Sequence, residues 1–90
     1  MNLPLYTITT KGHNAIDTTI SGNSDLGQVL ICIDTLPQSH RDLYESFKTR
    51  VPFMEPDVHK QFDFIMDNLP VILKKLRTDQ LIKLQRRQIF

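Results

Sequence analysis

The densest apolar run of the chain lies between Ser24 and Leu36, and its spacing predicts a buried helix. Four of its residues recur at i, i+3, i+4 and i+7, the spacing of one helix face: Leu26, Val29, Leu30 and Ile33. Ser24 is a favourable N-cap, and Asp25 places negative charge in the first turn. The apolar residues after Gly27 also fit a buried strand, so periodicity leaves both readings open, and the cap favours the helix. Because the run is apolar nearly all round, we expect neighbouring elements to cover it on more than one side.

A second helix is predicted to begin at Ser39. Ser39 and Asp42 have the spacing of a capping box, in which each side chain bonds to the backbone of the other residue. The apolar stripe that follows is Leu43, Phe47 and Val51. Pro52 disfavours helical backbone at the residue before it, so the helix is expected to end there.

A third helix is predicted to begin near Pro56, because proline suits the first turn of a helix. Its apolar stripe is the most regular in the chain: Val58, Phe62, Ile65 and Leu69. Phe64 and Met66 lie off this stripe and are expected in a second layer of the core. If both were exposed, they would mark a surface for a partner.

The N-terminal segment Leu3–Thr10 alternates apolar residues with threonines, which predicts a short strand with one buried face. Pro4 confines this strand to a sheet edge or to its own start. Lys11-Gly12 is interpreted as the turn that ends it. The next segment, His13–Ile20, fits either a short helix or a returning strand, and both remain open.

The last segment is predicted to be helical from Val71 to Phe90, after Pro70 ends or kinks the preceding helix. Residues 70–90 are therefore a candidate for a separate C-terminal helical arm. The apolar residues of this arm spread too widely around a helix for one intramolecular face to cover. We expect them to form a homodimer or partner interface, since leaving several in water is costly. The interface residues are Val71, Leu73, Leu76, Leu81, Ile82, Leu84, Ile89 and Phe90.

The cations of the chain gather toward the C-terminus, although the formal net charge is only +1. Residues 1–60 hold five Lys or Arg against seven Asp or Glu, and residues 61–90 hold six against three. Phosphate binding requires such a cluster, but an ordinary solvated helix face has the same composition. The candidate nucleic-acid contacts are Lys74, Lys75, Arg77, Lys83, Arg86 and Arg87. If residues 57–69 entered a DNA groove, three aspartates would meet phosphates, so DNA binding is the less favoured alternative.

Candidate catalytic chemistry is sparse. His13, His40 and His59 are far apart and lie in no nucleophile, metal or phosphate motif. His59 and Asp63 stand at i, i+4, but two ligands do not make a metal site. The three glycines are scattered and form no phosphate loop. We therefore expect no enzyme activity, no catalytic residue, no metal and no cofactor.

A chain of 90 residues with 40% hydrophobic residues predicts one small domain over 1–90. Domains of this size are often marginal in stability, and oligomers are common among them. Cys32 is the only cysteine, which excludes an internal disulfide. Its place in the apolar run predicts a buried, inert thiol, and a reducing compartment fits. The N-terminus lacks a signal-peptide pattern, and no apolar run approaches the roughly 20 residues that span a bilayer. A cytoplasmic location without membrane contact is expected.

The stretch Tyr6-Thr7-Ile8-Thr9-Thr10-Lys11-Gly12 resembles the "leucine-threonine, any, lysine-glycine" strand of small bacterial winged-helix and winged-helix-like regulatory domains. Residues 26–34 look like their first core helix, and residues 39–43 look like the start of the second. The resemblance covers roughly residues 5–69. Thr35 stands where a glycine commonly follows the aspartate at Asp34, and no glycine-turned hairpin after Leu69 would form a wing. The resemblance therefore implies a winged-helix-like fold without a clear wing, and it implies no function.

Taken together, the patterns predict a mainly α fold with a small N-terminal β-strand or hairpin. The favoured function is a non-enzymatic regulatory or adaptor domain that acts by protein-protein contacts as a homodimer. The alternative is a DNA-binding transcriptional regulator that uses the basic C-terminal region.

Overall fold

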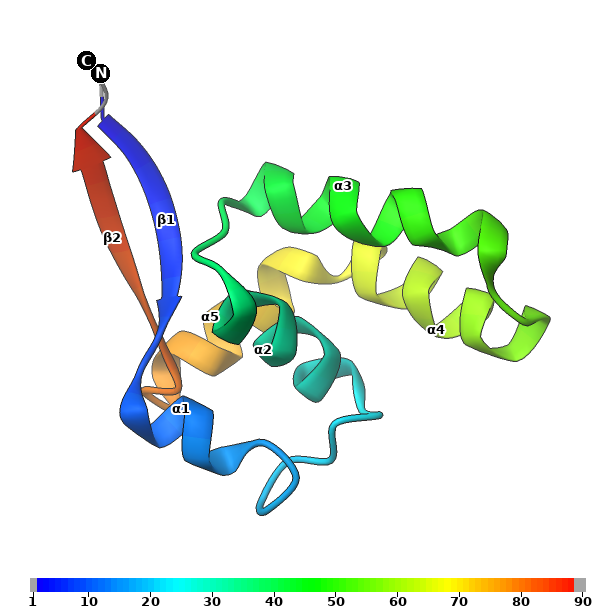
Figure 1. Ribbon diagram of the computed structural model, residues 1–90, viewed down its shortest axis with the longest axis horizontal. Coiled ribbons are helices and arrows are strands. Elements are labelled where there is room, and N and C mark those ends of the chain that lie inside the picture. Colours follow the sequence, from blue (N-terminus) through cyan, green and yellow to red (C-terminus); the bar gives the residue numbers. More distant parts are fainter. Residues whose placement is uncertain (1, 89–90) are drawn as a thin grey trace.

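The computed structural model describes residues 2–88, with side-chain burial described from Pro4 to Gln85. Its elements in chain order are β1 (Asn2–Ile8), α1 (Thr10–Ala15), α2 (Asp25–Thr35), α3 (His40–Arg50), the 3-10 helix η1 (Val51–Phe53), α4 (Pro56–Asp67), α5 (Leu69–Thr78) and β2 (Ile82–Gln88). The two strands run side by side along one side of the molecule, and α3 and α4 pack together on the other (Figure 1). The predicted fold class, mainly helical with a small sheet, is confirmed.

Helix α2 forms as its apolar pattern predicts and contacts β1, α1, α4 and α5. The Ser24 hydroxyl accepts a hydrogen bond from the backbone nitrogen of Gly27 at 3.1 Å, which is the predicted N-cap. Val29, Leu30 and Ile33 are buried in the core. The strand reading of this segment is therefore wrong. The helix is not covered all round, because Ile31 between these residues is exposed.

The capping box of α3 is confirmed. The Ser39 hydroxyl accepts from the Asp42 backbone nitrogen at 3.1 Å, and the Asp42 carboxylate accepts from the Ser39 backbone nitrogen at 3.1 Å. These two bonds satisfy donors that have no partner within the helix. The stripe of Leu43, Phe47 and Val51 is buried, and α3 ends at Arg50, before Pro52.

Removing the cap by Ser39→Ala is expected to lower the free energy of unfolding by about 1 kcal/mol. The loss arises because the Asp42 backbone nitrogen loses its acceptor at the start of α3. The measurement is a urea denaturation followed by circular dichroism. Thr78→Ala is the control, since the Thr78 hydroxyl only donates to the Lys74 carbonyl within its own helix. Equal losses in the two variants would contradict the role of the cap.

Helix α4 buries Phe62 and Ile65, and Leu69 is buried at the start of α5. The rings of Phe62 and Phe47 meet edge to face, with centroids 5.0 Å apart and planes at 86°, so they join α4 to α3. Val58, the first residue of the predicted stripe, is exposed. Off the stripe, Phe64 is 53% exposed but Met66 packs against the core, so the two do not form an exposed pair.

The predicted break at Pro70 is confirmed. Helix α4 ends at Asp67 and α5 begins at Leu69, which places Pro70 in the first turn, where a missing backbone donor is tolerated. The Asn68 side-chain amide donates to the Phe64 carbonyl at 2.9 Å and so satisfies an acceptor at the end of α4.

The C-terminal segment differs from its prediction. The predicted helix over Val71–Phe90 ends at Thr78, and residues 82–88 form strand β2, antiparallel to β1, in a register that pairs Ile8 with Ile82. Gln80 has a left-handed backbone with φ of 61°, and the chain turns there between α5 and β2. The prediction of a separate helical arm over 70–90 is therefore wrong for the part that forms β2. The part that forms α5 is helical, but it contributes to the core. The N-terminal strand is confirmed, but its partner is this distant strand and not a neighbouring hairpin strand.

The interpretation of Lys11-Gly12 as a turn is also wrong, because both residues lie in α1. Thr9 is the N-cap of α1: its hydroxyl accepts from the Gly12 backbone nitrogen at 3.0 Å and donates to the Gln80 carbonyl at 2.7 Å. A Cβ atom added to Gly12 would overlap the backbone oxygen of Leu81. Glycine at this position therefore lets α1 approach the turn between α5 and β2.

The segment His13–Ile20 is helical only at its start, and the alternative of a returning strand is wrong. Its first three residues finish α1, and Ile16 and Ile20 then form an isolated bridge around a left-handed Asp17 with φ of 61°. The Asp17 carboxylate accepts from the Gly22 backbone nitrogen at 2.9 Å and stabilises the turn. Over residues 2–88, no helix has both the length and the apolar character needed to cross a bilayer.

Candidate functional site

The apolar residues predicted as an interface are mostly not on the surface. Leu73, Leu76, Leu81 and Ile82 are buried in the core of the single chain. Val71 is 67% exposed and Leu84 is half-buried, while Ile89 and Phe90 lie outside the described residues. The expected apolar interface is therefore not assembled in the described part of the tail, because packing against α2 and β1 takes up its larger apolar side chains.

Four cations of the same segment face solvent. We call α5 and β2 together, residues 69–88, the basic unit. Its exposed cations are Lys74, Lys75, Arg77 and Lys83. Lys75 forms an ion pair with Asp79, with 3.8 Å between Nζ and Oδ2. Arg86 and Arg87 also belong to the unit, as residues of β2. The candidate nucleic-acid contacts thus lie on two elements that follow one another in the fold.

Two of these cations converge on one place. Lys74, Arg77 and Thr78 line a shallow depression of about 280 Å³ near the end of α5. Positions 74 and 77 are one helical turn apart, so their side chains lie on the same face of the helix. Both side chains are exposed and neither has a salt bridge among the described residues. The depression is therefore a positively charged point on the surface.

Charge is strongly segregated between the basic unit and the rest of the protein. Residues 69–88 carry six Lys or Arg and a single acid, Asp79. The remaining residues carry five Lys or Arg and nine Asp or Glu. The net charge of +1 thus combines +5 in the basic unit with −4 elsewhere. An anionic partner is attracted to one part of the surface and repelled by the rest.

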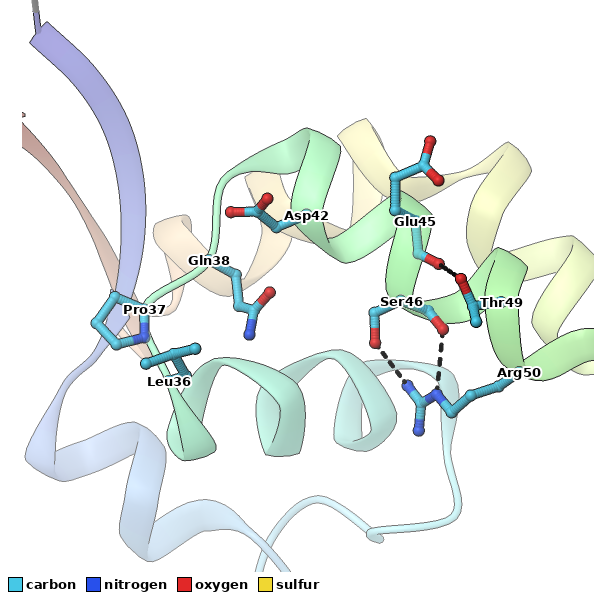
Figure 2. A pocket seen from close by; sticks show the side chains of 8 residues that line it. All are labelled: Leu36, Pro37, Gln38, Asp42, Glu45, Ser46, Thr49 and Arg50. Carbon is cyan, nitrogen blue, oxygen red and sulfur yellow. Dashed lines mark hydrogen bonds between the residues drawn. The ribbon is translucent and has the colours of Figure 1, made fainter.

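A groove runs along one side of α3, and we call it the α3 groove (Figure 2). Its volume is about 590 Å³, and it is lined by Leu36, Pro37, Gln38, Asp42, Glu45, Ser46, Thr49 and Arg50. The α3 residues follow one another at i, i+3, i+4, i+7 and i+8, so a single face of the helix forms the wall. The Leu36 side chain at the apolar end is 60% exposed.

Arg50 lies at the opposite end of the α3 groove (Figure 2). Its Nε donates to the Ser46 carbonyl at 3.3 Å, and its Nη2 lies 3.2 Å from Cys32 Sγ. The guanidinium also stacks over two aromatic rings, 4.9 Å from the centroid of Phe47 and 5.3 Å from that of Phe62. Among the described residues it has no carboxylate partner. A fixed positive charge thus stands at this end of the groove.

Cys32 is half-buried and packs against the core, so the prediction of a buried thiol holds only in part. It lies on the side of α2 that meets Arg50 and not on the side that carries Leu30 and Ile33 into the core. The inertness of the thiol stays a prediction, which thiol labelling under native conditions would test.

The three histidines do not come together. The Nδ1 atom of His13 lies 2.8 Å from a carboxylate oxygen of Asp34, and the Nδ1 atom of His59 lies 3.1 Å from one of Asp63. His40 lines a separate cleft of about 530 Å³ between the sheet and the start of α3. In the part of the chain that the structure describes, no group of three or more His, Cys, Asp or Glu residues is placed to hold a metal ion.

The α3 groove was not predicted from the sequence. A partial signal is present, because Leu36 follows the last turn of α2 and falls outside the stripe of Leu26, Val29, Leu30 and Ile33. The position of Arg50 carries no such signal. It depends on how Phe47, Phe62 and Cys32 meet from three different helices.

Comparison of the chain with protein-family models, with curated proteins and with solved structures gives no match.

Proposed function

We propose that the protein is a non-enzymatic regulatory domain that binds nucleic-acid phosphates through the basic unit. The observation that carries this proposal is that the apolar and the cationic side chains of the basic unit point in different directions. Its large apolar residues pack inward, whereas Lys74, Lys75, Arg77 and Lys83 point into solvent. Apart from the exposed Val71, the described surface that this segment offers to a partner is therefore mainly cationic.

Binding of this kind follows the charge and not the base sequence. Lys and Arg side chains neutralise phosphates and release counterions, and this supplies sequence-independent affinity. The net charge of −4 outside the basic unit opposes any second contact with the same polyanion. We therefore expect weak, salt-sensitive binding with equal affinity for duplexes of unrelated sequence.

The test is fluorescence anisotropy with a short labelled DNA duplex over a salt titration. Four phosphate contacts would give a slope of log K against log salt of about −3.6, or about −0.9 for each contact. In the double variant Lys74→Gln/Arg77→Gln, binding should weaken and the slope should fall to about half. A slope reports phosphate contacts, so a change in folding stability alone does not imitate this result.

The matched control is Lys48→Gln/Lys60→Gln, which removes the same charge from exposed positions on α3 and α4. This control should keep the slope of the unmodified protein. Absence of binding by the unmodified protein at low salt would overturn the proposal. Equal loss in both double variants would show that net charge alone governs binding and would overturn the basic unit as the site.

The interpretation as an adaptor that acts by protein-protein contacts drew its support from the apolar tail. Because four of those residues pack inside the single chain, this support no longer favours it over nucleic-acid binding. The present proposal also includes two expectations from the sequence: the resemblance to winged-helix-like domains, and a cytoplasmic location in a bacterium. A competition with poly-glutamate in the same titration distinguishes the two kinds of partner. If poly-glutamate displaces DNA only when its carboxylates are in large excess over the DNA phosphates, phosphate binding is supported. Tighter binding of poly-glutamate than of DNA would favour an acidic protein as the partner.

A further inference from the structure

The wall of the α3 groove has a charge polarity along its length. Asp42 and Glu45 stand toward the start of α3, and Arg50 stands at its end. Eight residues at 1.5 Å each separate the first from the last, a distance of about 12 Å. Glu45 has no salt bridge among the described residues, and neither has Arg50. The groove therefore presents an acidic part and a fixed basic end that are not neutralised by each other.

A second copy of α3, running antiparallel, matches this polarity. In a two-fold arrangement, a residue i of one chain that contacts residue j of the other implies that residue j of the first chain contacts residue i of the second. Every favourable pair therefore occurs twice. An axis near Ser46 sets Arg50 of each chain against the acidic part of the other. Ser46 at the midpoint is small, which allows two helices to approach closely.

The apolar end of the groove contributes the second observation. Leu36 is 60% exposed beside Pro37, and it stands at the acidic end of the wall. The antiparallel arrangement brings this side chain to the far end of the partner's α3, where the methylene groups of Arg50 provide apolar surface. Burial of Leu36 there removes from water one of the most exposed large apolar side chains described.

We propose that the α3 groove is the contact surface of a homodimer, in which two α3 helices lie antiparallel. The guanidinium of Arg50 in each chain faces Asp42 and Glu45 of the other, and Leu36 is buried at both ends. The surface does not overlap the basic unit, so the dimer is independent of the nucleic-acid binding proposed above. A dimer would present two basic units to the same polyanion.

The test is sedimentation velocity of the full chain at concentrations up to about 1 mM. The unmodified protein should show a concentration-dependent dimer. Leu36→Glu and, separately, Glu45→Arg should raise the dimer dissociation constant by about tenfold or more, because each places an unpaired or like charge in the interface. Both residues are exposed, so folding should be unchanged. Val71→Glu is the matched control: an equally exposed apolar residue outside the groove, whose variant should still dimerise.

A charge exchange sharpens the test. Arg50→Glu alone should dimerise about tenfold or more weakly than the unmodified protein, as should Glu45→Arg alone, but a mixture of the two should form heterodimers with both charge pairs restored. If Arg50→Glu does not fold, because Arg50 also holds Phe47, Phe62 and Cys32, the Leu36→Glu and Val71→Glu comparison decides. A chain that is monomeric up to about 1 mM would overturn the proposal. A dimer whose dissociation constant is unchanged by Leu36→Glu and by Glu45→Arg would also overturn it.

Discussion

Replacement of Phe62 by alanine is expected to lower the free energy of unfolding by about 3–5 kcal/mol, as truncations of core aromatic residues do. Phe62 is buried and its ring meets Phe47 edge to face. It also supports the guanidinium of Arg50, at 5.3 Å from the ring centroid. The substitution thus leaves a cavity where α3 and α4 meet and removes a surface on which Arg50 rests. For a domain of this size, such a loss is a large share of the total stability.

Urea denaturation followed by circular dichroism measures this effect, and Phe64→Ala is its matched control. Phe64 is the same residue type on the same helix, two positions further along, but it is 53% exposed. Its truncation should change the free energy of unfolding by about 0.5 kcal/mol or less, as surface substitutions do. If the two variants lost equal stability, the ring of Phe62 would not be a principal contact between α3 and α4.

The second large effect is expected from Gly12→Ala, which should destabilise the protein by about 1–3 kcal/mol. Alanine is favoured over glycine in a helix by about 1 kcal/mol, and an exposed position would show that gain. At Gly12 the new Cβ would instead overlap the backbone oxygen of Leu81, and a backbone atom moves only if α1 and the turn before β2 separate. That movement would strain the hydrogen bond from the Thr9 hydroxyl to the Gln80 carbonyl.

Thermal and chemical denaturation of Gly12→Ala should be compared with those of Gly22→Ala. The nearest atom to a Cβ at Gly22 belongs to the side chain of Asp17, which can move away at the cost of one hydrogen bond to the Gly22 backbone nitrogen and without any shift of the backbone. The Gly22 variant should therefore be the more stable of the two. A stabilised Gly12→Ala protein would show that the contact between α1 and Leu81 is looser than the structure gives it.

The helices from 24 to 69 could be predicted because local signals agree with the packing. Ser24 and Ser39 are caps, Pro56 suits a first turn, and each helix carries its apolar residues at helical spacing. The tail could not be predicted in the same way. Ile82 and Leu84 alternate with polar residues over too short a stretch to decide between strand and helix, and their partners lie at the other end of the chain.

Of the two candidate surfaces, the basic unit could be predicted in part from the sequence, and the α3 groove could not. The gathering of cations in 69–88 is visible in the sequence, because it depends only on composition. The exposure of Lys83, and the burial of Ile82 beside it, depends on the pairing of β2 with β1. The α3 groove depends on tertiary contacts alone, since Arg50 is positioned by residues of α2, α3 and α4.

The pairing of β1 with β2 also determines the order in which the chain can fold. About 70 residues separate Ile8 from Ile82, and closing so long a loop costs roughly 2–3 kcal/mol more chain entropy than closing a short hairpin. Docking of α1 against the end of α5, through the contact between Thr9 and Gln80, closes nearly the same loop, so most of this cost is met before the strands pair. The strands can next join at Ile8 and Ile82 and extend outward. During synthesis β1 leaves the ribosome before β2, so its ladder of hydrogen bonds with β2 can form only after the helices between the two strands have been made.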